Sequence, residues 1–293
     1  MKFRGHETFT IRKGWLNKGL KNIMKEPGVF LGDGGNPMDI LGIGANMVKS
    51  LRYWLTATQL TSEPTFGHRV QSMTEQGRII FENDPYFEEG GTLALIHYFL
   101  ASNEDNATAW YIFFNYFEYT EFSEDDFRSS VKKYVRMNSD KELPSERSIS
   151  DDFKAIVGTY YTKPGVINPE DNLECPFAAL GLVDFIYNKN GERIYKKTAV
   201  KETYLPDLVA LSIILKNSVG QKEIKISTIL KNENSLGKIF NLDIIRLMNI
   251  LYRLEAKGYI KVIRTAGLDV IQVITEMDYL DCIRYYYNNL NIL

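Results

Sequence analysis

An amphipathic helix preceded by a glycine-rich turn is the feature that most constrains the fold of this chain. Residues 30–60 predict a short helix, a glycine-containing turn and a longer helix, which is the order of a helix-turn-helix unit. Helical periodicity places one set of side chains on the inner face of the longer helix: Met47, Leu51, Trp54, Leu55 and Thr58. The opposite face carries a polar, cationic stripe: Asn46, Lys49, Arg52, Tyr53 and Thr56.

The second helix of such a unit enters the major groove of DNA, where long side chains contact bases and phosphates. We therefore expect Asn46, Lys49 and Arg52 to contact DNA, because Lys and Arg neutralise phosphates, and Asn and Arg recognise base edges. Three further cations of the basic N-terminal segment join this predicted DNA-binding set: Arg4, Arg12 and Lys13. The alternative is that the stripe is simply the solvated side of an amphipathic helix.

The charge distribution supports a DNA-facing surface more than the net charge of −2 does. Residues 1–80 hold eleven Lys or Arg against six Asp or Glu, whereas residues 81–126 hold eleven Asp or Glu and no Lys or Arg. A basic segment beside an acidic one indicates one surface that meets phosphate and another that avoids DNA or meets a basic protein. Solvated helix faces are the simpler explanation of the same pattern.

The segments outside this unit give weaker signals. We expect strand-like alternation at the N-terminus leading into a helix that Pro27 and Gly28 close, and an apolar core helix capped by Thr92. Residues 72–87 form either a strand after a turn or the start of a helix, and the aromatic stretch 109–122 is buried as either helix or strand. Residues 138–152 read as a loop, and Asn190-Gly191 as a hairpin turn.

The last ninety residues predict helix, helix, helix and β-hairpin, which is the order of a winged helix. On the third helix we expect one inward set: Ile244, Leu247, Met248, Leu251 and Leu254. The outward face carries Arg246, Asn249, Arg253 and Lys257. The first three of these, together with Arg264 of the hairpin, form a second predicted DNA-binding group. Winged helices also serve as protein-docking modules, so docking is the alternative here.

These patterns together predict a mostly α fold with small β-hairpins (α+β). The expected domains are an N-terminal helix-turn-helix-containing domain over 1–137, a connecting region over 138–200 and a C-terminal winged-helix-like domain over 201–293. No apolar run approaches the ~18 to 20 residues of a membrane span, so we expect a cytoplasmic protein that does not contact membranes.

Candidate chemistry is confined to acidic residues near histidines. Hydrolytic cleavage of DNA uses carboxylates, often with a histidine, to hold a divalent ion. His6 and Glu7, joined by Asp33 or Asp39, form one candidate cluster, and we expect Mg²⁺ or Mn²⁺ and no organic cofactor. A second cluster has a turn and a core histidine as its simpler explanation: Asp84, Glu88, Glu89 and His97.

Other common sites are disfavoured. The glycines of residues 32–44 lack the G-x-x-x-x-G-K-[ST] pattern of a nucleotide loop and more simply provide a tight turn. Cys175 and Cys282 are too few for a disulfide framework and are expected to be buried.

Several long blocks in this order resemble a bacterial domain family of unknown function found in DNA phosphorothioation and phage-defence gene clusters. The blocks are FRGHETFTIRKGWLNKG, LGIGANMVKSLRYWL, DPYFEEGGTLALIHYFL and NLECPFAALGLV, which cover at least residues 3–182. The chain departs from this family at Gln59-Leu60, where Gly-Leu is expected. The matching polar or special positions are Gly5, His6, Glu7, Arg12, Trp15, Asn46 and Lys49.

The resemblance implies a role in DNA sulfur modification. In single-strand versions of such systems the similar component is associated with DNA nicking, so a metal-dependent nickase is the leading hypothesis. The partners it implies are DNA, a cysteine desulfurase, a phosphosulfate-reductase-like enzyme and an ATPase. A non-catalytic DNA-recognition or scaffold subunit and a winged-helix regulator of the gene cluster are the alternatives.

Overall fold

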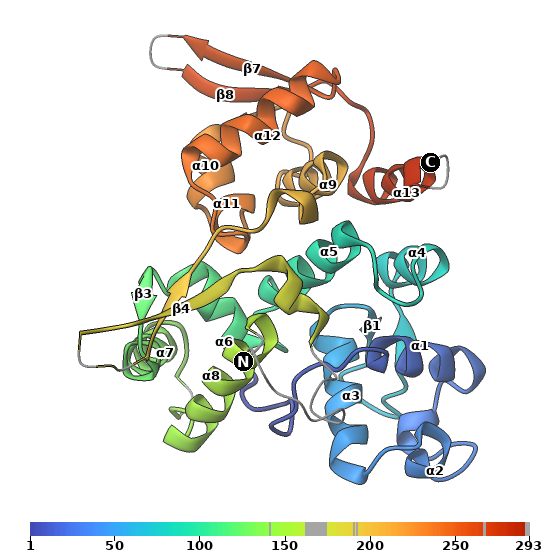
Figure 1. Ribbon diagram of the computed structural model, residues 1–293. Helices are drawn as coiled ribbons and strands as arrows, with labels where there is room; N and C mark the ends of the chain where they lie inside the picture. The colour runs from blue at the N-terminus through green and yellow to red at the C-terminus, as the bar shows by residue number, and fades with distance from the viewer. Residues whose placement is uncertain (141, 162–174, 190, 192, 266–267, 291–293) are drawn as a thin grey trace.

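The computed structural model describes residues 1–140, 142–161, 175–189, 191, 193–265 and 268–290 (Figure 1). The described chain combines many short helices with small antiparallel sheets, as the predicted mixture of helices and hairpins required. Within it, no helix has both the length and the apolar character needed to cross a bilayer.

The N-terminal third is helical apart from one two-stranded ribbon. Its elements are α1 (Trp15–Lys25), η1 (Val29–Leu31), α2 (Pro37–Leu41), α3 (Ala45–Ala57), β1 (Thr61–Ser62), β2 (Ser72–Met73) and α4 (Glu75–Asn83). The predicted short helix, glycine turn and longer helix are α2, Gly42 to Gly44 and α3. Gly42, in the left-handed region at φ 60°, ends α2. The helix alternative for residues 72–87 is confirmed by α4.

Three details of this third differ from the sequence expectations. Residues 1–14 form turns and contain no strand. Tyr53 is buried at 5% exposure and so does not belong to the polar stripe of α3. The buried face of α3 is therefore wider than predicted, because the N-terminal turns pack over Tyr53.

The middle of the chain supplies the core. Its elements are α5 (Gly90–Ala101), α6 (Thr108–Tyr111), the π-helical turn η2 (Ile112–Tyr116), β3 (Glu121–Phe122), α7 (Glu124–Asn138), α8 (Glu146–Tyr160), η3 (Pro176–Leu180), β4 (Val183–Tyr187) and β5 (Arg193–Lys197). Helix α5 is buried from Gly91 to Ala101 and contacts α6, α9, η2, η3 and η4, so it is the central helix of the molecule. Of the aromatic stretch after it, residues 109–116 are helical and mostly buried, as one alternative predicted, whereas Tyr119 is 53% exposed and the last two residues form β3.

Two predictions for this region need correction. Thr92 does not cap α5, because the helix begins at Gly90 and the Thr92 hydroxyl hydrogen-bonds to the Tyr287 hydroxyl at 2.6 Å. The expected loop over 138–152 is shorter than predicted, because Ser145 caps α8 and the helix starts at Glu146. The predicted hairpin is present as β4 and β5. Strand β3 pairs with the other edge of β5, so the strand order is β3-β5-β4. Asn190 itself lies outside the described residues.

The C-terminal third contains η4 (Glu202–Tyr204), α9 (Asp207–Asn217), β6 (Glu223–Lys225), α10 (Ile226–Lys231), α11 (Leu236–Ile239), α12 (Ile244–Ala256), β7 (Ile260–Thr265), β8 (Leu268–Val273) and α13 (Tyr279–Leu290). Strand β6 joins the predicted hairpin in the order β6-β8-β7. Ile244 is 45% exposed rather than inward, whereas Leu247 to Leu254 supply the buried face of α12 as expected. Helix α13, which was not predicted, packs against α9 and α4 (Figure 1).

Candidate nucleic-acid interface

The N-terminal segment adopts a strained backbone. Arg4, Glu7 and Thr8 all have positive φ, at 55°, 49° and 68°. Non-glycine residues rarely occupy this left-handed region, and each costs about 1–3 kcal/mol unless its surroundings enforce it. The contacts that hold this segment must therefore be strong.

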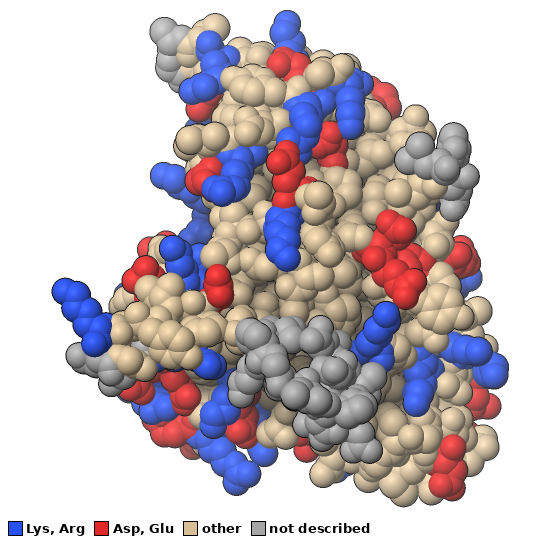
Figure 2. All heavy atoms as spheres, in the orientation of Figure 1, with Lys and Arg blue, Asp and Glu red and all other residues tan. Residues whose placement is uncertain are grey.

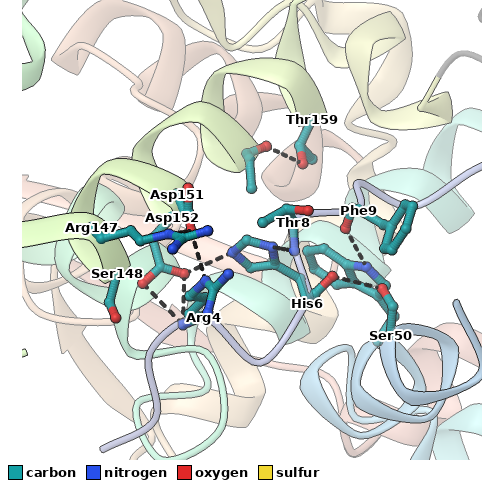
Figure 3. Close-up of polar contacts among 12 residues, drawn as sticks. Arg4, His6, Thr8, Phe9, Ser50, Arg147, Ser148, Asp151, Asp152 and Thr159 are labelled. Carbon is teal, nitrogen blue, oxygen red and sulfur yellow. Dashed lines mark hydrogen bonds and ion pairs between the residues drawn. The ribbon is translucent and has the colours of Figure 1, made fainter. Parts of the chain in front are cut away.

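A buried histidine provides the central contact. His6 is fully buried, and its Nε2 lies 2.9 Å from Oδ1 of Asp152 on α8 (Figure 3). The backbone N–H of Thr8 donates to His6 Nδ1 at 3.1 Å, so Nδ1 is the acceptor nitrogen and Nε2–H donates to Asp152. Both ring nitrogens are thus engaged, and neither is free to bind a metal ion. The geometry makes His6 a positioning residue.

Asp152 connects the same segment to α8. Its two carboxylate oxygens accept the backbone N–H of Arg4 at 3.0 and 3.1 Å, and Asp151 accepts the Arg4 Nε–H at 2.6 Å (Figure 3). Burial raises the pKa of Asp152, while the hydrogen bond from His6 opposes that shift. The guanidinium of Arg4, which was predicted to contact DNA, is thus paired with Asp151.

Helix α3 holds the other side of the segment. Ser50 Oγ donates to the His6 carbonyl at 2.9 Å, and Trp54 Nε1 donates to the Phe9 carbonyl at 3.0 Å. The His6 ring also stacks on Trp54, with ring centroids 6.1 Å apart. Gly5 lies directly on Tyr53, because a Cβ at Gly5 would be 2.4 Å from the Tyr53 ring. This close approach is why Tyr53 is buried.

The segment and α3 together form one side of a groove of about 1010 Å³, which we call the α3 groove. From the N-terminal segment its lining includes Lys2, Gly5 and Glu7, and from α3 it includes Lys49, Arg52, Tyr53 and Thr56. The other side consists of residues 59, 61–65, 69, 74, 76 and 102–106. The structure therefore brings Glu7, Lys49 and Arg52, which the sequence had singled out for two different roles, to one surface.

The cations of the α3 groove differ in how free they are. Arg52 pairs with Glu63 at 2.8 Å and donates to the Arg69 carbonyl at 2.9 Å, and Arg69 pairs with the same Glu63 at 3.4 Å. Lys49 is exposed, and no carboxylate of the described chain lies within ion-pair distance of it. Lys2 lies over the Tyr53 ring, 5.1 Å from its centroid. Lys49 and Lys2 are thus the cations best placed to meet an added anion.

An unsatisfied hydroxyl also lines this groove. Thr61 is 2% exposed, and its Oγ1 has no hydrogen-bond partner within the described structure. Buried polar atoms are almost always hydrogen-bonded, so this hydroxyl is an exception within the described structure.

The remaining predicted N-terminal cations lie elsewhere. Arg12 packs against the rings of Phe9 and Trp15, and Lys13 pairs with Glu88 at 3.5 Å. Both line a separate cavity of about 650 Å³ beside Tyr86. Asn46 is exposed at the start of α3 but does not line the α3 groove.

Each predicted cation of the C-terminal third is paired with a nearby carboxylate. Arg246 pairs with Asp243, and Arg264 pairs with Asp269 at 2.9 Å. Arg253 pairs with Asp207 and Glu202 at 2.8 and 2.7 Å. Over α12 and the β7–β8 hairpin, at the upper end of Figure 2, cationic and acidic side chains accordingly lie beside one another. Arg246, Asn249 and Arg253 line a cavity of about 350 Å³.

Comparison with known proteins gives the affiliation. Residues 3–287 match the family model described as protein of unknown function (DUF4007). The chain belongs to the DUF4007 family. A comparison with curated proteins found no match.

This DUF4007 chain is similar to two solved structures over nearly its full length. The crystal structure of magnesium ion-bound SspB is 26% identical with a TM-score of 0.86, and a second SspB crystal structure is 25% identical with a TM-score of 0.84. Each comparison covers 99% of this chain and 89% of the SspB chain.

The candidate metal ligands of the DUF4007 chain lie in separate places. Within the described residues, no three His, Cys, Asp or Glu side chains gather closely enough to hold a metal ion. In the second predicted cluster, Asp84 accepts the backbone N–H groups of Glu88 and Glu89 at 3.1 and 3.0 Å. Of the first cluster's added acids, Asp33 pairs with His68 at 3.4 Å. Within the described residues, neither predicted cluster therefore brings three such side chains together.

His97 is a buried core histidine, and the two cysteines are buried, as their simpler explanations predicted. His97 is fully buried, donates from Nε2 to the Ile239 carbonyl at 2.9 Å and contacts the Tyr160 hydroxyl through Nδ1 at 2.8 Å. Burial lowers the pKa of His97 to about 4. Cys175 and Cys282 are buried free thiols, and burial raises the pKa of each to about 12.

Sequence analysis missed Asp152, although its signal is present. Ile149, Phe153 and Ile156 repeat at helical spacing, and Asp152 falls on their apolar face. A carboxylate in such a position must find a buried partner, which here is His6. Assigning residues 138–152 to a loop concealed this pattern.

Proposed function

We propose that this DUF4007 chain is the DNA-binding component of a bacterial DNA phosphorothioation system, and that it binds duplex DNA in the α3 groove. The similarity to SspB over nearly the full length supports the assignment to such a system. The main observation in support of the binding site is that Glu7, Lys49 and Arg52 line one groove. Among them, Lys49 makes no ion pair within the described structure.

In this proposal α2 and α3 act as a helix-turn-helix unit, and α9 to β8 act as a winged helix with α12 as its third helix. The element order and the strand order β6-β8-β7 support this interpretation. The paired cations of α12 support protein docking as its main role. The expected partners are the cysteine desulfurase, the phosphosulfate-reductase-like enzyme and the ATPase of the system.

Nicking is the reaction that we propose for the α3 groove. Glu7 is the carboxylate we assign to it, because it is partly exposed in the groove while its neighbour His6 is anchored in the core. One SspB crystal structure contains a magnesium ion, which supports a test with Mg²⁺ and Mn²⁺. Because both ring nitrogens of His6 are hydrogen-bonded in the core, the second candidate is a DNA-recognition subunit that does not cut.

The binding site is tested by the salt dependence of duplex affinity. Each phosphate contact contributes about 0.9 to the slope of log K against log salt. The double variant Lys2→Ala, Lys49→Ala should therefore bind a labelled duplex more weakly, with a slope reduced by about 1.8. Fluorescence anisotropy at several salt concentrations measures both quantities.

A charge-matched control is available on α1. Lys21 and Lys25 are exposed, line none of the cavities described above and make no ion pair within the described structure. The control Lys21→Ala, Lys25→Ala should leave the slope within about 0.5 of the original value. An unchanged slope in the groove variant, or an equal reduction in the control, refutes the α3 groove as the binding site.

A further inference from the structure

A second groove, of about 540 Å³, lies between α7 and the α10–α11 segment, and it shares no residue with the α3 groove. We call it the lysine groove. Its lining consists of Asn115, Tyr116, Glu118, Tyr119, Ser129, Ser130, Lys133, Lys231, Glu233 and Lys238. Elements from the middle and the C-terminal third of the chain therefore build it together.

The lysines of this groove carry more free charge than its two acids. Lys133 and Lys231 are exposed, and within the described structure neither makes an ion pair. Lys238 is paired at 3.2 Å with Glu118, a side chain that is 80% exposed and so weakly held. The other acid, Glu233, accepts a hydrogen bond from the Tyr111 hydroxyl at 2.8 Å.

A fourth lysine, Lys197, lies buried near Lys238. Lys197 Nζ donates to the carbonyls of Phe113 and Phe117, each at 2.5 Å, near the end of η2. Burial and, to a smaller extent, repulsion from Lys238 lower the pKa of Lys197 to about 7, while Glu118 opposes the shift. An anion bound beside Lys238 relieves this repulsion, so the local field favours a negatively charged ligand.

Aromatic and hydroxyl groups lie among the lysines. Tyr119 is 53% exposed and rests against Phe117, with ring centroids 5.2 Å apart. Ser130 adds a hydroxyl group on α7, whereas the Ser129 hydroxyl already donates to the Asp125 carbonyl at 2.8 Å. A cationic groove with an exposed aromatic ring is the pattern that binds single-stranded nucleic acid, because lysines follow the backbone while unpaired bases stack on the ring.

We propose that the lysine groove binds single-stranded DNA, with Lys133, Lys231 and Lys238 on its phosphates and Tyr119 stacked on a base. The choice of a nucleic-acid ligand rests on the proposed function. The groove gives the protein a site for an unpaired strand that is separate from the duplex site on α3. In a duplex the bases are already stacked and paired, so Tyr119 discriminates in favour of the single strand.

The test uses the full-length protein, a labelled oligothymidylate and a labelled duplex. The double variant Lys133→Gln, Lys231→Gln should weaken oligothymidylate binding and reduce the salt slope by about 1.4, since each single-strand phosphate contact contributes about 0.7. Tyr119→Ala should weaken the same complex about five-fold or more without changing the slope. Duplex affinity should change less than about two-fold in both variants.

The control Lys154→Gln, Lys222→Gln removes two exposed lysines outside both grooves. It should bind oligothymidylate like the original protein. Because Lys133 and Lys231 are exposed, their variants should keep the original melting temperature, which circular dichroism verifies.

Three results overturn this proposal: no oligothymidylate binding by the original protein, an unchanged affinity in the lysine variant, or an equal loss in the control. An equal loss of duplex binding in the lysine variant also overturns it, because the two grooves would then not be separate sites. Failure of the α3 groove is recognised independently, by an unchanged duplex slope in the Lys2→Ala, Lys49→Ala variant.

Discussion

His6 and Glu7 are adjacent in the sequence and have opposite environments in the structure. The positive φ of Glu7 turns the chain so that His6 enters the core while Glu7 lines the α3 groove. From sequence the two residues formed a single acidic–histidine candidate cluster. The backbone turn that separates them is not visible in residue types, because it depends on contacts with α3 and with Asp152 on α8.

The different roles of these residues predict different mutant phenotypes. His6→Ala should reduce the free energy of unfolding by about 3–5 kcal/mol, because it removes a fully buried ring and leaves the buried Asp152 carboxylate with the Arg4 N–H as its remaining partner. Glu7→Gln, a nearly isosteric change of a partly exposed residue, should stay within about 0.5 kcal/mol of the original protein. Urea unfolding measures both values. A His6→Ala variant within 1 kcal/mol of the original protein contradicts the anchoring role.

At the scale of elements, α3 and α12 show how far an amphipathic pattern can be trusted. For both helices most of the residues predicted to face inward are buried, because the apolar face of an amphipathic helix packs against the core. The exceptions, Tyr53 on α3 and Ile244 on α12, depend on whether another segment covers that part of the helix. The pattern also could not tell a free cation from a paired one.

This difference in pairing predicts unequal contributions to duplex binding. The carboxylates of Asp243 and Asp269 offset the charges of Arg246 and Arg264, whereas Lys49 has no acidic partner within the described structure. Arg246→Ala and Arg264→Ala should therefore each lower duplex affinity by less than about two-fold, and Lys49→Ala should lower it more. Titration at one fixed salt concentration compares the three variants. A larger loss for either arginine variant assigns the main DNA contact to the C-terminal third.

Ile245, beside Ile244 at the start of α12, is 70% exposed. A large apolar side chain in this position, among internally paired charges, is consistent with the docking role that we propose for the C-terminal third.

At the scale of the whole molecule, contacts between distant parts of the sequence determine the arrangement. His97 and Thr92 of α5 hydrogen-bond to residue 239 and to Tyr287, and Tyr98 donates to Asn217. Most elements were predictable, because periodicity, glycines and proline mark them locally. Helix α13 also shows this periodicity, with Leu280, Ile283 and Tyr287 on its buried face, and sequence analysis missed it. The two grooves and the His6–Asp152 pair could not be predicted, because they depend on side chains that lie far apart in the sequence.

The most direct test of the α3 groove as a DNA-processing site is the relaxation of supercoiled plasmid in Mg²⁺ or Mn²⁺. The original protein should convert supercoiled plasmid to open circles. Lys2→Ala, Lys49→Ala should require more DNA to reach half of its maximal rate, while Glu7→Gln should lower the rate at saturating DNA by roughly 100-fold. Equal rates and equal DNA requirements for all three proteins would contradict the assignment of both binding and chemistry to this groove.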